Sequence, residues 1–252
     1  KSRKSFHSKM PKFSIITVVL NDKLELKKTI RSVLKQKFRN FEYLIIDGGS
    51  TDGTIEYAKE QGYDVHIQKE KGPRQAYNET FPLCVGDIVI TFSPDGNSIP
   101  EVIPSLITKF KEGYDMVIAS RYLGNAKSFD DGLMTSIGNR IFTKSINFFH
   151  GSVYTDALVM YRTYRKSLFY ELDLHKDESY NIEEKLFFTK LGIEPLLSVR
   201  AAKAKKKVGE IAADEPKRIG AEPKWMLLRN IRWGFAYYMQ VLKELFYWKA
   251  KR

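Results

Sequence analysis

Residues 13–22 read FSIITVVLND and residues 43–53 read YLIIDGGSTDG, and these two stretches decide the fold class. Each opens with an apolar, β-branched run that suits a strand buried on both faces. Each then ends in polar or glycine-rich residues that favour a loop. The helix expected over 24–36 lies between them, and its apolar face consists of Leu26, Ile30, Val33 and Leu34.

The same alternation continues to residue 120 and predicts an α/β fold, Rossmann-like, with a mostly parallel sheet and helices on both faces. Strands are expected around 65, over 87–92 and over 115–120, and helices from 54, over 74–83 and over 100–111. Beyond residue 120, helices are expected over 133–149, 182–191 and 225–248, and strands over 153–161 and 208–211. In such sheets ligands bind beyond the carboxyl ends of the strands.

The composition favours anionic partners. The 252 residues carry 42 Lys and Arg against 30 Asp and Glu, a net charge of +12, which attracts phosphates or an acidic lipid surface. Nucleic acid is not expected as a partner, because no recognised nucleic-acid-binding motif accompanies the charge. The single cysteine, Cys84, cannot form an internal disulfide and fits a cytoplasmic location. No apolar run approaches the roughly 20 residues that span a bilayer, so membrane association would be peripheral.

Three parts are expected: a flexible basic tail over 1–10, one α/β domain over 11–212, and a loop with an amphipathic helix over 213–252. Apolar residues recur along that helix every three or four positions: Trp225, Leu228, Ile231, Phe235, Met239, Leu242 and Phe246. Such a stripe suits a membrane interface, and equally a face packed on the domain or on a second copy in a homo-oligomer. A lysine cluster can face lipid headgroups or guard an exposed strand edge: Lys203, Lys205, Lys206 and Lys207.

Polar residues after the first two strands form the first candidate site. They are Asn21, Asp22, Asp47, Gly49, Ser50 and Asp52. A carboxylate at a strand end can accept hydrogen bonds from a nucleobase or a ribose, and glycines let the backbone approach a ligand closely. The alternative is a capped turn, with Ser50 or Asp52 capping the next helix.

These stretches, together with SVLKQKFRN over 32–40 and SPDGN over 93–97, resemble the family 2 glycosyltransferases of the GT-A fold. The resemblance implies that Asp47 contacts the base of a nucleotide sugar. It implies that the other residues of the first site line the nucleotide pocket. Val18 and Leu20 stand where the family often has a proline and an aromatic residue, so the base, uracil or guanine, stays open.

Ser93, Asp95 and Asn97 occupy the place of the family's acidic metal motif. The first acid is replaced by Ser93, and Asp95 remains. One carboxylate can suffice for Mg²⁺ or Mn²⁺, because such an ion takes further ligands from substrate phosphates and water. Asn97 can add an amide oxygen. The alternative is a Pro-Asp-Gly turn without a metal.

Lys71 lies just before an expected helix and Arg74 lies at its start, which is a favourable position for binding a phosphate. Residues 71–76 also resemble the family's Gly-x-x-x-Ala segment over the donor. The alternative is that both are solvated surface charges.

The second half resembles the dolichyl- and polyprenyl-phosphate mannose or glucose synthases at 118–122 (IASRY), 156–162 (DALVMYR) and 208–211 (VGEI). The resemblance extends to Arg218 and Lys224, which it places on the donor side. It implies that Arg121 binds an acceptor phosphate, with Arg140 or Asn139 near a second arginine position. A structural ion pair is the alternative for Arg121.

The resemblance implies an inverting transfer of a hexose from a UDP- or GDP-sugar to a polyprenyl phosphate or lipid-linked glycan at the cytoplasmic face of a membrane. An ionised phosphate acceptor needs no general base, whereas a sugar hydroxyl does. In a transferase that extends a polysaccharide at a hydroxyl, the candidate bases are Asp130, Asp131 and Asp156, although Asp156 suits an orienting role. The third alternative is an inactive nucleotide-sugar-binding protein, which Ser93 would favour.

Overall fold

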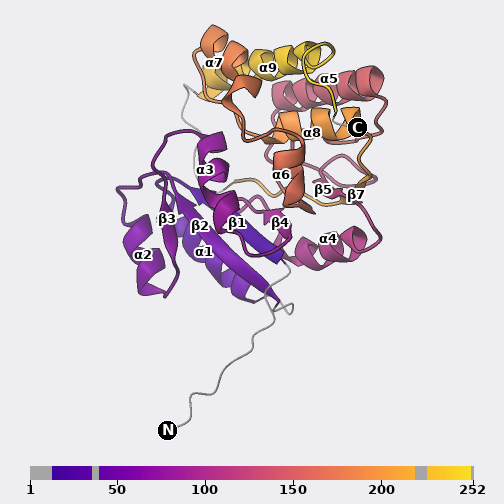
Figure 1. Ribbon diagram of the computed structural model, residues 1–252. Coiled ribbons are helices and arrows are strands. Elements are labelled where there is room, and N and C mark those ends of the chain that lie inside the picture. The colour runs from indigo at the N-terminus through magenta and orange to yellow at the C-terminus, as the bar shows by residue number, and fades with distance from the viewer. Residues whose placement is uncertain (1–12, 36–39, 219–225, 251–252) are drawn as a thin grey trace.

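The computed structural model describes residues 13–35, 40–218 and 226–250, and within them one seven-stranded sheet runs through the molecule (Figure 1). Its strands, in the spatial order β3-β2-β1-β4-β6-β5-β7, are β1 (Phe13–Val19), β2 (Phe41–Asp47), β3 (Val65–Ile67), β4 (Ile88–Thr91), β5 (Met116–Ser120), β6 (Arg162–Arg165) and β7 (Val208–Ala212). The described helices are α1 (Lys23–Leu34), α2 (Thr54–Glu60), α3 (Pro73–Thr80), α4 (Ile103–Phe110), α5 (Leu133–His150), α6 (Ser167–Glu171), α7 (Asn181–Phe187), α8 (Glu194–Lys203) and α9 (Met226–Lys243).

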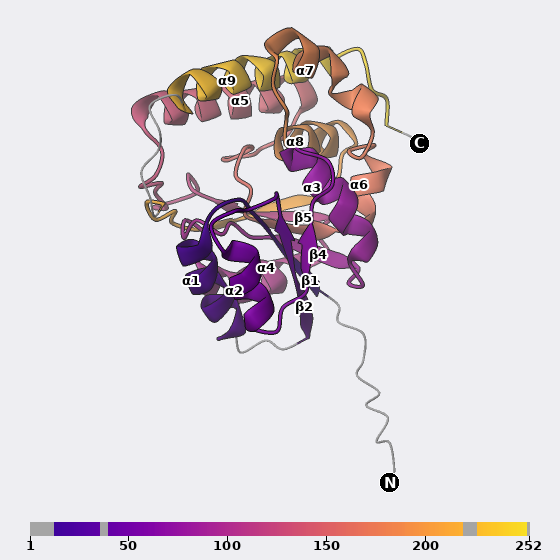
Figure 2. The same ribbon diagram turned by 90° about the vertical axis from the view of Figure 1, so that its left-hand side faces the viewer.

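The sheet is mostly parallel, as the alternating pattern predicts. β1 pairs in parallel with β2 and β4, and β5 does so with β7, whereas β6 is antiparallel to both β4 and β5. Every described strand except β6 therefore has its carboxyl end at the same edge. Figure 2 shows α1 and α2 on one side of the sheet and α3 and α6 on the other. The expected α/β fold, with helices on both faces and a C-terminal helix, is confirmed.

The apolar runs that predict strands form the core. Ile15, Ile16, Val89 and Val117 are almost fully buried, because both faces of β1, β4 and β5 are covered by helices. On one face Phe81 stacks on Phe169, with ring centroids 4.0 Å apart. This core fixes the strand ends, and so it fixes the loops that follow them.

The prediction of a strand over 153–161 is wrong. The strand in this region is β6, which begins at Arg162. The backbone N–H groups of Thr155 and Asp156 donate to the Glu210 carboxylate, and those of Leu158 and Val159 donate to the Asp156 carboxylate. Carboxylates thus take the donors that a sheet ladder would need, and the segment forms a loop at the edge where the parallel strands end.

Two helices, α6 and α8, have no counterpart in the sequence prediction. Eight of the ten residues of α8 are buried, so the helix lacks the polar face that an amphipathic pattern requires. The helix expected over 182–191 ends at Phe187, because Phe188 takes a left-handed conformation with φ of 47°.

The C-terminal helix α9 packs on α5, α7 and α8, and these helices lie together at the top of Figures 1 and 2. Its buried residues Ala236 and Val241 belong to the main core, and so does Trp248 in the segment that follows the helix. The expected domain boundary at 212 stays a prediction, and the tail over 1–10 and Lys224 lie outside the described residues. Within the described parts of the chain, no helix is long and apolar enough to cross a membrane.

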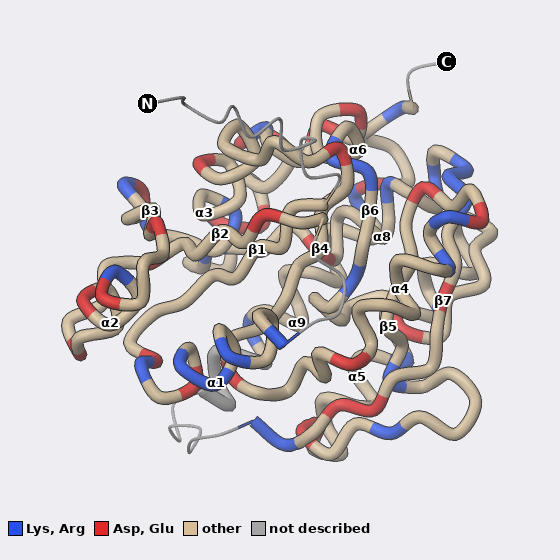
Figure 3. The backbone as a smooth tube through the Cα atoms, turned by 90° about the horizontal axis from the view of Figure 1, so that it is seen from below, with Lys and Arg blue, Asp and Glu red and all other residues tan. Residues whose placement is uncertain are grey.

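Charged residues of both signs are distributed around the molecule, with basic residues gathered along α1 (Figure 3). The lysine cluster, which begins at the last residue of α8, is engaged within the chain: Lys206 pairs with Glu171 at 2.6 Å, and Lys205 donates to the carbonyl of His150. Lys207 donates to the carbonyl of Glu112. These contacts tie the turn before β7, an edge strand, to its neighbours.

Candidate active site

The loops that follow β1, β2, β3, β4, β5 and β7 all begin at the carboxyl edge of the sheet. Because β2, β1 and β4 are adjacent, the predicted nucleotide loops and the predicted metal turn are brought together. The loop before β6 starts from the same edge. The topology therefore gathers most of the sequence-predicted residues into one region.

Asp47, the last residue of β2, is fully buried. Its Oδ1 accepts hydrogen bonds from the backbone N–H groups of Gly49 (2.8 Å) and Ser50 (2.6 Å). Gly49 has φ of +97°, which a residue with a Cβ rarely adopts. Oδ2 of Asp47 is buried without a hydrogen-bond partner among the described residues. Asp47 therefore shapes the loop with one oxygen and keeps the other as an unused acceptor.

The loops after β1 and β2 brace each other. Asn21 donates through its backbone N–H to the hydroxyl of Ser50 (2.8 Å), and its side-chain oxygen accepts from the backbone of Thr51 (2.8 Å). Asp52 accepts from the backbone N–H groups of Lys23 (3.1 Å) and Thr54 (3.0 Å). Gly53 is the N-cap residue of α2, and Asp52 just before it holds the start of the helix through its bond to Thr54. Although burial acts to raise it, these bonds keep the pKa of Asp52 below its usual value.

Asp22 lies among other acids. Partial burial raises its pKa to about 7, with further contributions from a hydrogen bond to Glu25 and from the charges of Glu25, Asp95 and Asp52. The proximity of like charges makes the ionised carboxylate costly. This corner of the edge therefore favours a cation or a proton.

The turn after β4 is built around Asp95. Its Oδ1 accepts from the hydroxyl of Ser93 (2.5 Å) and from the backbone N–H of Asn97 (3.3 Å). Thr29 of α1 donates to the carbonyl of Pro94 (2.9 Å), which fixes the turn to the helix. Among the described residues Oδ2 of Asp95 accepts no hydrogen bond. Ser93 supports the carboxylate in this arrangement, and only Asp95 offers an unused oxygen.

Asn97 and Arg218, predicted for the metal and the donor, meet at Asp130. Arg218 donates through Nε (2.8 Å) and Nη2 (2.6 Å) to Oδ2 of Asp130 and through its backbone N–H (3.0 Å) to Oδ1. Asn97 adds a side-chain hydrogen bond to the same carboxylate. Although burial acts to raise it, these partners hold the pKa of Asp130 below its usual value. Arg218 is thereby held beside the metal turn.

Arg121 follows β5 and is surrounded by carboxylates. It donates through Nε to Asp156 (2.7 Å) and through Nη1 to Glu215 (3.0 Å), and Nη1 lies 3.2 Å from Asp131. The guanidinium is also 5.4 Å from the ring of Tyr122. This is the geometry of the ion-pair alternative, and three carboxylates around one cation leave the cluster with negative charge.

Asp156 is fully buried and belongs to the loop before β6, where it accepts hydrogen bonds from the backbone N–H groups of Leu158 and Val159. Besides Arg121, it accepts from the amide of Asn139 on α5 (2.9 Å). Burial acts to raise the pKa of Asp156, but Arg121 and Asn139 hold it below the usual value. A buried, paired carboxylate of low pKa suits the orienting role and cannot act as the general base in this state.

Arg74 differs from both sequence interpretations. Only 1% of it is exposed, and it is neither solvated nor open to a phosphate. It pairs with Asp177 and Glu184 and lies 4.5 Å from the ring of Tyr180, so it ties α3 to α7. The sequence could not show this, because its partners lie more than 100 residues away.

Lys71 and Arg140 remain exposed. Neither has an ion-pair or hydrogen-bond partner among the described residues. Lys71 stands before α3, and Arg140 follows the buried Asn139 on α5. Among the predicted phosphate-binding cations that the structure describes, Lys71 and Arg140 are therefore exposed and unpaired, whereas Arg74, Arg121 and Arg218 are paired with carboxylates.

Two carboxylates that contact predicted site residues were not predicted from the sequence. Glu215 completes the Arg121 cluster, and Glu210 holds the backbone of 155–156. Glu210 lies in the quoted VGEI segment, where a charged residue inside an apolar strand was the available signal. Glu215 follows β7, and the edge position of that loop was the corresponding signal for it.

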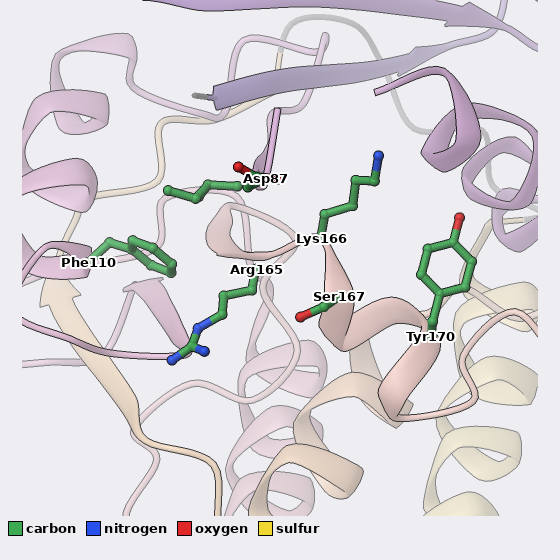
Figure 4. A pocket seen from close by; sticks show the side chains of 7 residues that line it. Asp87, Phe110, Arg165, Lys166, Ser167 and Tyr170 are labelled. Carbon is green, nitrogen blue, oxygen red and sulfur yellow. The ribbon is translucent and has the colours of Figure 1, made fainter. Parts of the chain in front are cut away.

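A separate hollow of about 570 Å³ lies at the opposite edge, where β4 begins and β6 ends (Figure 4). Phe110, Arg165 and Tyr170 line part of it. Because the amino end of β4 is there, this hollow is remote from the converging loops and is not the predicted donor site.

The model of the family described as glycosyl transferase family 2 matches residues 14–173. The chain belongs to this family. The match includes β1, β2, β4 and β5 with their loops, as well as Asp156 and β6. The family assignment from the sequence is thus confirmed.

Two curated proteins to which this chain is similar are transferases. This chain is 31% identical over 193 residues to "Glycosyltransferase AglJ" of Haloferax volcanii, and the match covers 75% of this chain and 58% of the relative. It is 27% identical over 165 residues to "Undecaprenyl-phosphate 4-deoxy-4-formamido-L-arabinose transferase" of Aeromonas hydrophila, covering 62% of this chain and 49% of the relative. The chain thus spans only about half the length of these relatives.

Among solved structures, the family 2 chain resembles glucosyl-3-phosphoglycerate synthase from Mycobacterium tuberculosis. The complex of that enzyme with Mn²⁺, UDP and phosphoglyceric acid matches with a TM-score of 0.63 and 16% identity, covering 94% of this chain and 79% of that one. Its complex with Mg²⁺ and UDP matches with a TM-score of 0.62 and 19% identity, covering 93% and 78%. At this identity the likeness establishes the GT-A fold.

Proposed function

We propose that the protein is an inverting glycosyltransferase that moves a hexose from a UDP- or GDP-sugar to a polyprenyl phosphate or a lipid-linked glycan at a membrane surface. The observation that carries the proposal is the convergence of Asp22, Asp47 and Asp95 at the ends of three adjacent parallel strands in a family 2 chain. The name of the undecaprenyl-phosphate transferase supports a polyprenyl phosphate acceptor.

The donor nucleotide would bind at the loops after β1 and β2. The unused, buried Oδ2 of Asp47 is an acceptor for an N–H of the base. Asn21, Ser50 and Asp52 hold these loops rigid, so little ordering is needed when the donor binds. Their role in this proposal is to position the pocket.

The residues present fit a divalent ion, because Asp95 keeps one carboxylate oxygen without a hydrogen bond and lies near Asp22. Asp95 would hold Mg²⁺ or Mn²⁺ together with donor phosphates and water, a ligand set that Mg²⁺ accepts. When bound, the ion would supply neutralisation of the leaving diphosphate. The complexes of the Mycobacterium tuberculosis enzyme with Mn²⁺ or Mg²⁺ and UDP support this choice.

Two cations would complete the diphosphate site. Arg218 is held by Asp130 next to Asn97, and Lys71 is exposed before α3. A guanidinium fixed by a bidentate carboxylate keeps its orientation, which suits repeated phosphate binding. Lys224 stays a prediction outside the described residues.

For the acceptor phosphate, the proposal relies on Arg140. Arg121 is engaged by three carboxylates, which would repel a second anion. Arg140 is exposed on α5 and follows Asn139, which is bonded to the Asp156 of that cluster. The Arg121 cluster would then fix α5 relative to the sheet, so that Arg140 meets the phosphate.

The negative charge around Arg121 favours a second candidate, transfer to a sugar hydroxyl. Asp131 is one of these carboxylates, is partly exposed and lies next to Asp130 at the metal turn. A hydroxyl acceptor needs a base in such a place, and it carries no charge for the cluster to repel.

The deciding experiment is a donor screen with Mn²⁺ and two acceptors, a short-chain polyprenyl phosphate and a neutral oligosaccharide. We expect transfer to the lipid phosphate, reduced about hundredfold or more by Asp95→Ala because diphosphate stabilisation is lost. Arg140→Ala should raise KM for the lipid phosphate. Transfer to the oligosaccharide that Asp131→Asn abolishes would establish the second candidate. Nucleotide-sugar binding without turnover on either acceptor would contradict both and indicate a binding protein.

A further inference from the structure

Helix α5 is apolar on two opposite sides. Asn139, Phe142, Ile146 and His150 face the interior. On the other side Leu133, Ile137, Ile141 and Phe148 are exposed, Leu133 by 81% and Phe148 by 82%. Their spacing of i, i+4, i+8 and i+15 places these four on one face. A surface helix normally presents polar residues there, and a helix that is apolar all round has a second partner.

Helix α9 repeats this arrangement. Ala236, Gln240 and Val241 of the helix are buried, as is Glu244 just after it. Four residues of the stripe expected from the sequence are exposed, Ile231, Phe235 and Leu242 on the helix and Phe246 three residues after it, Phe246 by 86%, whereas Trp225 and the side chain of Leu228 lie outside the described residues. Thus the core of this domain does not cover these residues, and the spacing of i, i+4 and i+11 places Ile231, Phe235 and Leu242 on one outer face of α9.

Acidic and basic residues of these helices differ in where they lie: the acids are buried, and the exposed charges are basic. The acids within 133–150, 181–190 and 231–250 are Glu183, Glu184 and Glu244, and all three are buried. They pair inward with Lys243, Arg74 and Arg200, respectively. The exposed charges on the three segments are basic, with Arg140 and Lys144 on α5, Lys185 on α7 and Arg232 on α9 among them. Asp177 and Glu178, exposed just before α7, lie outside these segments, and Asp177 pairs with Arg74.

We infer that the outer faces of α5, α7 and α9 together form a docking surface for an anionic lipid bilayer. The helices lie together at one end of the molecule (Figures 1 and 2). Exposed apolar residues would enter the headgroup boundary, and the basic residues would meet anionic headgroups. This inference deepens the proposed function and rests on it for the choice of a lipid acceptor.

Charge favours the bilayer over a second copy of the chain. A two-fold dimer would pair this surface with the same surface of its partner. Basic residues would then face basic residues across the interface, and like charges at an interface are costly. A bilayer that contains anionic lipid satisfies the apolar stripes and the basic residues at once.

The test is co-sedimentation of the full chain with vesicles of phosphatidylcholine, alone or with about 30% phosphatidylglycerol. We expect binding to the anionic vesicles that weakens as salt is raised. Two double variants should each lower the partition coefficient at least about tenfold: Ile141→Ser with Phe148→Ser on α5, and Phe235→Ser on α9 with Phe246→Ser just after it. Lys144→Gln with Lys185→Gln should lower it about fivefold for each charge removed.

The matched control is Leu83→Ser with Val85→Ser. Both residues are 46% exposed and lie just before β4, at the edge opposite the converging loops. This variant should bind vesicles like the unaltered protein. Circular dichroism would verify folding for every variant.

Three results would overturn the inference. They are no binding of the unaltered protein to anionic vesicles, equal binding by the stripe variants and the control, and a dimer in sedimentation velocity that the stripe variants dissociate. Calorimetry of UDP and GDP binding with Mn²⁺ separates this inference from the proposed function. Stripe variants that bind nucleotide but not vesicles support both. Failure of nucleotide binding in the unaltered protein would refute the donor site and leave the vesicle result standing.

Discussion

Arg121 donates to both carboxylate oxygens of Asp156, through Nε to Oδ2 at 2.7 Å and through Nη2 to Oδ1 at 3.1 Å. The two residues come from the end of β5 and from the loop before β6, 35 positions apart in the chain. Asp156 also binds Asn139 of α5. One buried ion pair therefore sets the positions of α5 and two edge loops relative to the sheet.

Asp156→Ala should destabilise the protein by about 3–5 kcal/mol, because it leaves the Arg121 guanidinium buried with a partner missing. Urea unfolding followed by circular dichroism measures the change. Asp131→Asn is the milder control, since Asp131 is partly exposed and is one of three carboxylates on Arg121. An unchanged urea midpoint for Asp156→Ala would show that the pair does not hold the edge loops.

Asp95→Asn should remove the stabilisation that Mn²⁺ with UDP or GDP gives to the protein, whereas Ser93→Ala should retain most of it. The reason is that Asp95 has the unused oxygen, whereas the Ser93 hydroxyl is engaged with Asp95, donating to its carboxylate and accepting from its backbone N–H. Ser93→Asp should lower Tm without metal, through like-charge repulsion, and enlarge the shift that Mn²⁺ produces. Thermal unfolding with and without metal and nucleotide measures all three. Equal metal shifts in Asp95→Asn and the unaltered protein would contradict the metal assignment.

Asp130→Asn should raise KM for the donor roughly tenfold or more, because Arg218 loses charge-assisted hydrogen bonds that orient it at the metal turn. KM for the acceptor should stay the same. Arg218→Lys is the matched variant, since it keeps the charge but cannot form the bidentate contact. A change in acceptor KM alone would place Asp130 on the acceptor side instead.

Asp22→Asn should raise Tm by a few degrees at pH 8 and have little effect near pH 4. The folded pKa of Asp22 is raised from 3.8 to about 7 by burial and neighbouring acids, so the folded protein holds the proton more tightly than the unfolded chain. Its contribution to the free energy of unfolding is therefore lost as pH rises from about 4 to about 7. Asparagine resembles the protonated form and avoids this loss.

Asp52→Asn is the control for this pH dependence, because its effect on Tm has the opposite sign. The pKa of Asp52 is lowered in the folded protein, so its carboxylate stabilises at neutral pH and this contribution is lost as pH falls. Asp52→Asn should therefore lower Tm at pH 8 and converge with the unaltered protein in acid. The same Tm change at pH 4 and pH 8 for Asp22→Asn would contradict the raised pKa.

The first half of the fold and the backbone of the donor site were predictable from the sequence. β1, β2, β4 and β5 are short apolar runs bounded by turn residues, and both features are local. Asp47 ends a strand in the sequence pattern as it does in the structure. The loop over 153–161 was mispredicted as a strand because its apolar residues resemble one, while the carboxylates that take its N–H groups are contributed by Asp156 and by the distant Glu210.

By itself, the sequence determined the mostly parallel sheet, the edge at which its loops converge, and the loops that contain Asp22, Asp47 and Asp95, since burial periodicity and turn chemistry are local properties. Only the tertiary structure decided that Arg74 and Arg121 are paired inside the protein, that Arg140 is exposed, and that Ile231, Phe235 and Leu242 of α9 face outward. The state of a charge and the partner of an apolar face depend on residues far apart in the chain. Those neighbours are fixed only when the helices and strands pack.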